Sequence, residues 1–276
     1  MSDVLLQEHL LLGALMVESD GQQVVSAYAG LDDEMSAFVN GVALCDLSGI
    51  TALLIDGLDG EAFAHMLFAG KRLAVGEVAF EAVLTGEGGI VSVPLVMRTG
   101  QHEHVCWDLS SRSALLDSWA GFLAQVEQRG QKAFPNLGLE DVSDAFVPLL
   151  LCGPAADAVL KDYLGTQQLP EVRHVASLQL DRIGCIVATL DLGKHPCYLV
   201  LVPPAFARVL WRSFLSFTYV TPVGREALRS WALGTKLGDV VGWLKQQDRV
   251  QVPRQELISR GLVRADGGFV GERGLS

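Results

Sequence analysis

Several side chains of this 276-residue chain could do chemistry, but their spacing favours simpler roles. His102 and His104 fall on one face of an expected strand and could ligate a metal. A solvated strand end is the favoured interpretation, because a metal site needs more ligands than this pair. Gly86-Glu87-Gly88 begins like a dinucleotide fingerprint, yet it lies in an expected hairpin rather than between a strand and a helix. Cys45, next to Asp46, is typical of core packing. Spacing alone assigns no catalytic group and no metal site.

The order of the expected elements repeats along the chain. An apolar strand, a helix, three strands and a second helix run from residue 53 to 130, and the same series runs from residue 147 to 214. Helices separated by several strands lack the strict alternation of a Rossmann sheet. We therefore expect an α+β fold of two intertwined ferredoxin-like halves, whose antiparallel sheets must position any site.

The net charge of −11 comes entirely from the first quarter of the chain. Residues 1–70 hold 11 Asp and Glu and no Lys or Arg, which leaves 21 charges of each sign in the remainder. A nucleic acid would be repelled by this segment and finds no basic run elsewhere, so nucleic-acid binding is not expected.

Neither a membrane span nor a secretory signal is expected. The longest apolar runs, such as residues 146–152, are far shorter than the roughly 18 residues that cross a bilayer. The apolar stretch at residues 10–17 lacks the positively charged flank of a signal peptide. The five cysteines are widely spaced and form no CxxC pair. We therefore expect a cytoplasmic protein without a disulfide framework.

The strings Val42–Ser48 and Leu53–Gly60 resemble neighbouring motifs of the aminomethyltransferase family, the T protein of the glycine cleavage system. Further family motifs have counterparts in the same order: a Gly-Gly-Ile hairpin, an Arg-containing helix and a Phe-Ile-Gly ending. The matching segments are Glu87–Val91, Leu95–Arg98, Pro222–Arg229 and Gly267–Leu275. The resemblance therefore spans nearly the whole chain.

This resemblance implies a folate-binding fold, in which a ferredoxin-like domain is inserted into a second α+β domain around a tetrahydrofolate site. We therefore expect residues 1–52 and 147–276 to form a discontinuous α+β domain and residues 53–146 to form the inserted ferredoxin-like domain. In that arrangement part of the N-terminal acidic charge would be neutralised by arginines near the C-terminus, namely Arg249, Arg254, Arg260, Arg264 and Arg273. Full-length family members add a C-terminal β-barrel after the Phe-Ile-Gly segment, and no such barrel is expected here.

Three positions depart from the family motifs. Ser92, in Ser92-Val93-Pro94, stands where the family has two consecutive aspartates, one of them the essential acid beside folate. A serine hydroxyl can donate or accept a hydrogen bond but cannot take up the charge of a carboxylate. Tyr198 stands where a family glutamate grips the pterin ring, and Ile50 lies in the segment that replaces the family's His-Met-Gly. The resemblance makes all three candidate cofactor-binding residues and leaves the catalytic residue unknown.

Arg225 and Arg229 match family positions that would hold the folate carboxylates. Guanidinium groups suit that anion because their N–H groups form a fork that matches a carboxylate. The alternative is a solvated helix face, since the two arginines are spaced i and i+4.

Two functions are compatible with these residues. As an enzyme, the chain would be a one-carbon transferase that passes a methyl or aminomethyl unit to tetrahydrofolate. As a degenerate module, it would keep the fold and bind another ligand or a protein, which the loss of both acidic residues favours. The expected partners are a folate and either a carrier protein or a subunit that supplies the missing barrel. The sequence identifies neither the donor nor the oligomeric state.

Overall fold

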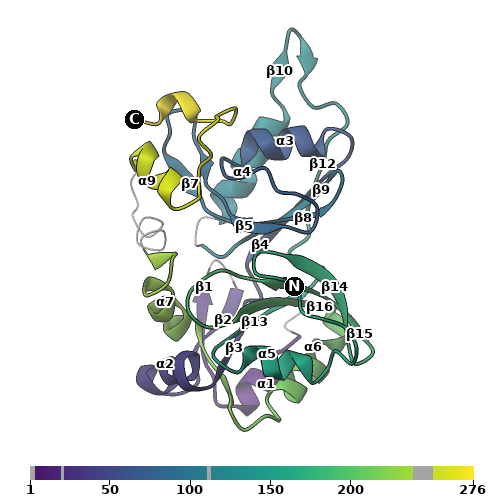
Figure 1. The fold of residues 1–276 in the computed structure, drawn as a ribbon, viewed down its shortest axis with the longest axis vertical. Coiled ribbons are helices and arrows are strands. Elements are labelled where there is room, and N and C mark those ends of the chain that lie inside the picture. Colours follow the sequence, from purple (N-terminus) through teal and green to yellow (C-terminus); the bar gives the residue numbers. More distant parts are fainter. Residues whose placement is uncertain (1–3, 20–21, 111–112, 239–250) are drawn as a thin grey trace. The chain divides into compact units, whose positions relative to one another are not determined.

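The computed structural model describes residues 4–19, 22–110, 113–238 and 251–276, and the chain divides into two compact units. Unit 1 contains residues 1–49 and 144–239, and unit 2 contains residues 50–143 and 240–276 (Figure 1). Within the described residues, no helix combines the length and the apolar character that a membrane span requires.

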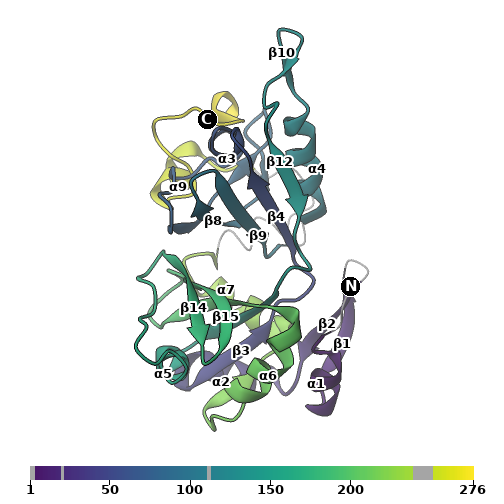
Figure 2. The same cartoon turned by 90° about the vertical axis from the view of Figure 1, so that its right-hand side faces the viewer.

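A six-stranded sheet forms the centre of unit 1 (Figure 2). Its strands run in the order β14-β15-β16-β13-β3-β17, and every neighbouring pair is antiparallel except β3 with β17. Alternate strand residues such as Leu151 and Val200 pack in one core with Val159 and Trp211, which come from helices α5 and α6. The bounds are β3 Val42–Asp46, β13 Val147–Cys152, β14 Val175–Leu180, β15 Ile183–Thr189, β16 Cys197–Val202, β17 Val220–Pro222, α5 Ala156–Lys161 and α6 Pro204–Phe214.

The remaining elements of unit 1 are α1 (Leu6–Leu11), the hairpin of β1 (Leu15–Ser19) and β2 (Gln22–Ala27), α2 (Leu31–Asn40) and α7 (Arg225–Leu233). A buried carboxylate of α2 links the segment after β2 to the start of α7. Glu34 is 1% exposed, and its carboxylate accepts hydrogen bonds from the backbone N–H groups of Tyr28 and Ala29, at 2.6 and 2.9 Å. Its second oxygen accepts the N–H of Gly224 at 2.6 Å. Glu34 therefore anchors the start of α7, where Arg225 lies.

Unit 2 is built on a five-stranded antiparallel sheet in the order β12-β4-β9-β8-β5. Phe63 and Leu67 of α3 pack with Leu116 and Leu123 of α4 in a core against this sheet. Two short antiparallel pairs, β6 with β7 and β10 with β11, complete the unit. The bounds are α3 Gly60–Leu67, α4 Ser113–Ala124, β4 Thr51–Asp56, β5 Val78–Phe80, β6 Val83–Leu84, β7 Ile90–Ser92, β8 Leu95–Gly100, β9 Glu103–Asp108, β10 Glu127–Gln128, β11 Gln131–Lys132 and β12 Gly138–Asp141.

The C-terminal segment packs in unit 2. It contains α9 (Arg254–Ser259) and the 3-10 turn η1 (Glu272–Gly274). Its backbone bonds to the α3–β6 region: the N–H of Arg264 donates to Ala69 O at 2.7 Å, and the N–H of Val270 donates to Met66 O at 2.9 Å. This differs from the expected grouping of the segment with residues 1–52. The arginines at 254, 260, 264 and 273 lie in unit 2, whereas most of the acids of residues 1–70 lie in unit 1, and Arg249 lies outside the described residues.

The expected α+β class with antiparallel sheets is confirmed, and the sheets formed by the described residues do not close into a barrel. The expectation of no disulfide is wrong. Cys152 and Cys197 are joined by a disulfide across a sequence separation of 45 residues. The pairing of β13 with β16 sets these two residues directly opposite each other. The spacing of the cysteines along the sequence does not reveal this strand register, so the disulfide could not be predicted from it.

Candidate functional site

The strongest candidate for chemistry is a buried carboxylate in unit 2. Asp108 ends β9 and is 0% exposed. Ser92 is the last residue of β7, and its Oγ donates a hydrogen bond to Asp108 Oδ2 at 2.6 Å. Ser92 is the position where the family motif would have an acid. The structure thus puts a carboxylate in direct contact with the serine that stands in place of the expected one.

A second serine links this carboxylate to the surface. Ser110 is half-buried, and it donates to Asp108 Oδ1 both its backbone N–H, at 2.9 Å, and its hydroxyl, at 2.6 Å. Burial raises the pKa of Asp108, although the hydrogen bonds from Ser110 and Ser92 oppose that rise. A carboxyl group with a raised pKa and a hydrogen-bonded hydroxyl route to solvent has the chemistry of a general acid or base.

The sequence contained a signal for Asp108 that the motif search missed. The pattern Asp-x-Ser occurs at residues 46–48, 108–110 and 141–143, each time where a strand ends. In all three, the serine backbone N–H donates to the aspartate two residues earlier, at 2.8 to 2.9 Å. Asp46 and Asp108 each use their second carboxylate oxygen to accept a hydrogen bond from another segment.

In unit 1 the corresponding aspartate belongs to a buried hydrogen-bonded chain. Asp46 Oδ2 lies 2.8 Å from His9 Nε2, and His9 Nδ1 lies 2.7 Å from the Tyr28 hydroxyl. Burial and the nearby Asp46 charge raise the pKa of Tyr28, so its hydroxyl stays protonated. Because a carboxylate only accepts hydrogen bonds, His9 donates its Nε2–H to Asp46. The chain fixes the Asp46–Ser48 turn.

The Asp46–Ser48 turn positions Arg225, one of the residues predicted to bind folate. Arg225 is half-buried, and its Nη2 donates to Ser48 O. His9, Asp46, Ser48 and Arg225 all line one small cavity of about 20 Å³. Arg229 lies one helical turn further along α7 and is exposed. The two arginines therefore share a face of α7, and the first is held by the buried chain.

The other two predicted ligand residues are buried. Tyr198 is 5% exposed and belongs to the core of unit 1, where burial raises its pKa to about 12 and keeps the phenol neutral. Ile50, directly before β4 in unit 2, is 7% exposed. Of the five predicted residues, Tyr198, Arg225 and Arg229 thus lie in unit 1, while Ile50 and Ser92 lie in unit 2.

The expected solvated strand end at His102 and His104 is wrong for His104. It is 2% exposed because β9 lies between β4 and β8 in the sheet, and its ring lies 6.5 Å from that of His65 on α3. Within the described part of the chain, no three His, Cys, Asp or Glu side chains are grouped so that they could hold a metal ion.

His65, Glu81 and His104 surround a cavity of about 10 Å³, which has room for about one water molecule. In each of them one buried polar atom lacks a hydrogen-bond partner among the described residues: His65 Nε2, Glu81 Oε1 and His104 Nδ1. Burial raises the pKa of Glu81 to about 8 and lowers the pKa of His104 to about 4. Near pH 6 the Glu81 carboxyl and the His104 ring are therefore both neutral, and Arg264, which also lines this cavity, supplies the buried charge.

The wild type is expected to become less stable as the pH rises, because Glu81 must ionise while buried. Glu81→Gln is expected to abolish this pH dependence. The folded-state pKa of about 8 exceeds the ordinary value of 4.5, so stabilisation by this group is complete below pH 4.5 and is lost as the pH rises through 8. At about 1.4 kcal/mol per pKa unit, the wild type should lose a few kcal/mol of unfolding free energy between roughly pH 5 and 9. Urea unfolding at both pH values measures this loss. Glu140→Gln, at an exposed strand position, should retain it, and an unchanged loss in Glu81→Gln would contradict the assignment.

The chain is similar in sequence to a known protein family and to individual members of it. The family described as GCVT N-terminal domain matches residues 5–240. An aminomethyltransferase of Desulfitobacterium hafniense is 25% identical over 235 residues, which cover 82% of this chain and 62% of the relative. An aminomethyltransferase of Rubrobacter xylanophilus is 25% identical over 279 residues, covering 98% of this chain and 70% of the relative. The chain thus spans less than two thirds of the length of the first of these relatives.

A solved structure has the same fold. The glycine cleavage system aminomethyltransferase T from Bartonella henselae superposes with a TM-score of 0.75 at 18% sequence identity. The match covers 98% of this chain and 72% of the Bartonella chain.

Proposed function

We propose a function from one premise: the chain belongs to the aminomethyltransferase family, through its GCVT N-terminal domain. The proposal is that it binds tetrahydrofolate and transfers a one-carbon unit, methyl or aminomethyl, to that carrier. The relatives' names support transfer of an aminomethyl group. Its partners would be the folate itself and a carrier protein, or a subunit that supplies a barrel domain.

The contact between Ser92 and Asp108 carries this proposal. Loss of the acid at position 92 is the main sequence argument against catalysis. Asp108 answers it, because its carboxylate lies 2.6 Å from Ser92 Oγ and its pKa is raised by burial. In this proposal Asp108 manages the proton of the folate nitrogen, with the Ser110 hydroxyl as the intermediate group.

The arginines of α7 are the residues of unit 1 that we propose to bind folate. Arg225 and Arg229 would bind the folate carboxylates through charge-assisted hydrogen bonds, which are stronger than hydrogen bonds between neutral groups. Arg225 is held in place by Ser48 O, so less side-chain entropy is lost when the anion binds. Ile50 is kept as a proposed apolar contact.

The alternative function is a binding module without turnover. The observation that favours it is the burial of Tyr198, which replaces the pterin-gripping glutamate of the family motif. Its ring packs in the core of unit 1, and a neutral phenol cannot reproduce the paired hydrogen bonds of a carboxylate. A protein of this kind would bind a folate more weakly and transfer nothing.

Tetrahydrofolate is expected to bind the wild type with a micromolar Kd in isothermal titration. Arg225→Ala should weaken binding about 10- to 100-fold, because a charged hydrogen bond contributes roughly 1.5–3 kcal/mol. Arg182→Ala removes an equally charged but exposed side chain of unit 1 and should leave the Kd unchanged. Absence of binding at millimolar tetrahydrofolate would overturn the proposal. Equal binding by Arg225→Ala would remove α7 from the site.

A further inference from the structure

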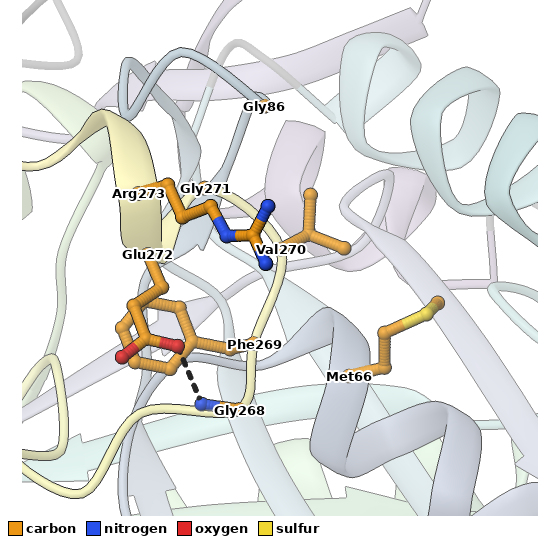
Figure 3. Close-up of a pocket in the computed structure, with 8 residues that line it drawn as sticks. All are labelled: Met66, Gly86, Gly268, Phe269, Val270, Gly271, Glu272 and Arg273. Carbon is orange, nitrogen blue, oxygen red and sulfur yellow. Dashed lines mark hydrogen bonds between the residues drawn. The ribbon is translucent and has the colours of Figure 1, made fainter.

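A separate pocket of about 370 Å³ lies wholly within unit 2 and has no part in the proposed folate site. It is lined by Met66 of α3, Gly86 of the hairpin turn between β6 and β7, and Gly268–Arg273 of the C-terminal segment (Figure 3). Its volume lies at the small end of the about 300–1,000 Å³ that is usual for small-molecule sites.

The walls of this pocket are held by backbone-to-backbone packing. A Cβ on Gly88 would lie 2.6 Å from Gly274 O, and a Cβ on Gly271 would lie 2.3 Å from Thr85 O. Gly271 also has a φ of +89°, which L-residues with side chains rarely adopt. The hairpin turn and the C-terminal segment are therefore in direct backbone contact beside the pocket, with no room for a side chain at either glycine.

The pocket has one positive group available for a ligand. Arg273 is exposed, and the described residues offer it no Asp or Glu within ion-pair distance. Figure 3 shows its guanidinium extending toward Val270, while the Glu272 carboxylate turns the other way. That carboxylate accepts the N–H of Gly268 at 2.8 Å and lies 3.6 Å from Arg254 Nη2, so its charge is already compensated.

The remaining lining is apolar. Met66 and Val270 are half-buried, and Phe269 is 7% exposed with Arg264 Cζ 4.9 Å from its ring centroid. These side chains cannot hydrogen-bond a compact hydrated anion such as inorganic phosphate. They can cover the carbon skeleton of a larger ligand. A single guanidinium fork matches the two oxygens of one carboxylate.

We propose that this pocket binds a small carboxylate-bearing molecule with an apolar body. The carboxylate pairs with Arg273, and the body lies against Met66, Phe269 and Val270. This assignment goes beyond the proposed one-carbon transfer and does not rest on it.

Benzoate and benzamide test the assignment, because they share a ring and differ in charge. In NMR titrations of the full chain, benzoate should shift the backbone amides of Phe269 and Val270 saturably in the millimolar range. Benzamide should bind at least about tenfold more weakly, since it lacks the charge that pairs with a guanidinium. Inorganic phosphate should not shift these amides. Equal affinities for benzoate and benzamide, or tighter binding of phosphate, would overturn the proposal.

Two variants and two controls locate the binding. Arg273→Gln should reduce benzoate binding to the level of benzamide. Gly86→Leu should abolish binding of both, because a Cβ at Gly86 meets no atom within 4 Å and the added side chain enters open space at the pocket. Gly121→Leu, also with no atom within 4 Å, and Arg225→Ala should both leave benzoate binding unchanged. Benzoate binding that survives Arg273→Gln and Gly86→Leu would refute the site, whatever the outcome for tetrahydrofolate.

Discussion

Arg264→Met is expected to lower the unfolding free energy of unit 2 by about 3–5 kcal/mol, the cost of breaking a buried charged network. The Arg264 side chain is 7% exposed and sits where the C-terminal segment meets α3. All five of its N–H groups donate to backbone carbonyls at 2.7 to 3.1 Å. The acceptors are His65 O, Phe68 O, Gly70 O, Gly267 O and Gly268 O.

The size of this effect follows from the acceptors left behind. Methionine can replace the apolar stem of the arginine, but it offers no donor to any of the five carbonyls. A buried carbonyl that loses its partner costs about 1–3 kcal/mol, and partial access to water reduces the sum. Three of the five carbonyls belong to residues 65–70 and two to residues 267–268, so the two segments lose their common support.

Hydrogen exchange separates this effect from general damage. In Arg264→Met, residues 60–84 should lose protection, whereas β13 and β16 of unit 1 should keep theirs. Arg273→Met is the matched control, because Arg273 is an exposed arginine of the same C-terminal segment; exposed charges contribute about 0–1 kcal/mol. Arg264→Lys should recover part of the stability through its three donors. Normal protection of residues 60–84 in Arg264→Met would contradict the role assigned here.

Strands bounded by clear sequence breaks could be predicted from the sequence to the residue. The apolar runs Val147–Cys152, Val175–Leu180 and Cys197–Val202 predict strands with the bounds that the structure has. The β-forming runs at residues 78–85 and 90–97 predict a hairpin of two long strands, but the structure divides this region into four strands, β5 to β8. The breaks come at Glu81 and Pro94, where the N–H of Glu81 donates to Pro94 O. A buried carboxylate within an apolar run is a tertiary feature, and propensity does not reveal it.

Only part of the candidate site could be predicted from the sequence. Motif matching identified position 92 as one that had lost an acid, but it could not locate the compensating carboxylate. Asp108 lies 16 residues away on another strand, and the contact depends on how β7 and β9 approach each other in space. The same limit applies to His9, Tyr28 and Asp46, which lie in α1, after β2 and at the end of β3. Their residue types are ordinary, and only the fold brings them together.

Asp108→Asn is expected to slow one-carbon transfer to tetrahydrofolate by about 10²- to 10⁴-fold, the usual contribution of a general acid or base. Asparagine has the shape of aspartate, so its Oδ1 can still accept from Ser110 while its amide faces Ser92. It cannot take up or release a proton near neutral pH. Tetrahydrofolate affinity should change by less than about tenfold, because the proposed carboxylate contacts are on α7 and do not involve this residue.

Single-turnover transfer from an aminomethyl-lipoyl carrier measures the rate, and titration in buffers of different ionisation enthalpy measures proton exchange on tetrahydrofolate binding. A structural role for Asp108 would reduce stability and leave proton exchange intact, whereas the proposed role predicts that Asp108→Asn removes that exchange at unchanged stability.

The strictest test moves the carboxylate from β9 to β7. Asp108→Ser alone should lose transfer, and adding Ser92→Asp should restore part of it, because the acid then returns to the position of the family motif. Transfer that is the same in the wild type and in Asp108→Asn would refute the assignment, and absence of transfer in both, with tetrahydrofolate bound, would favour the non-catalytic module.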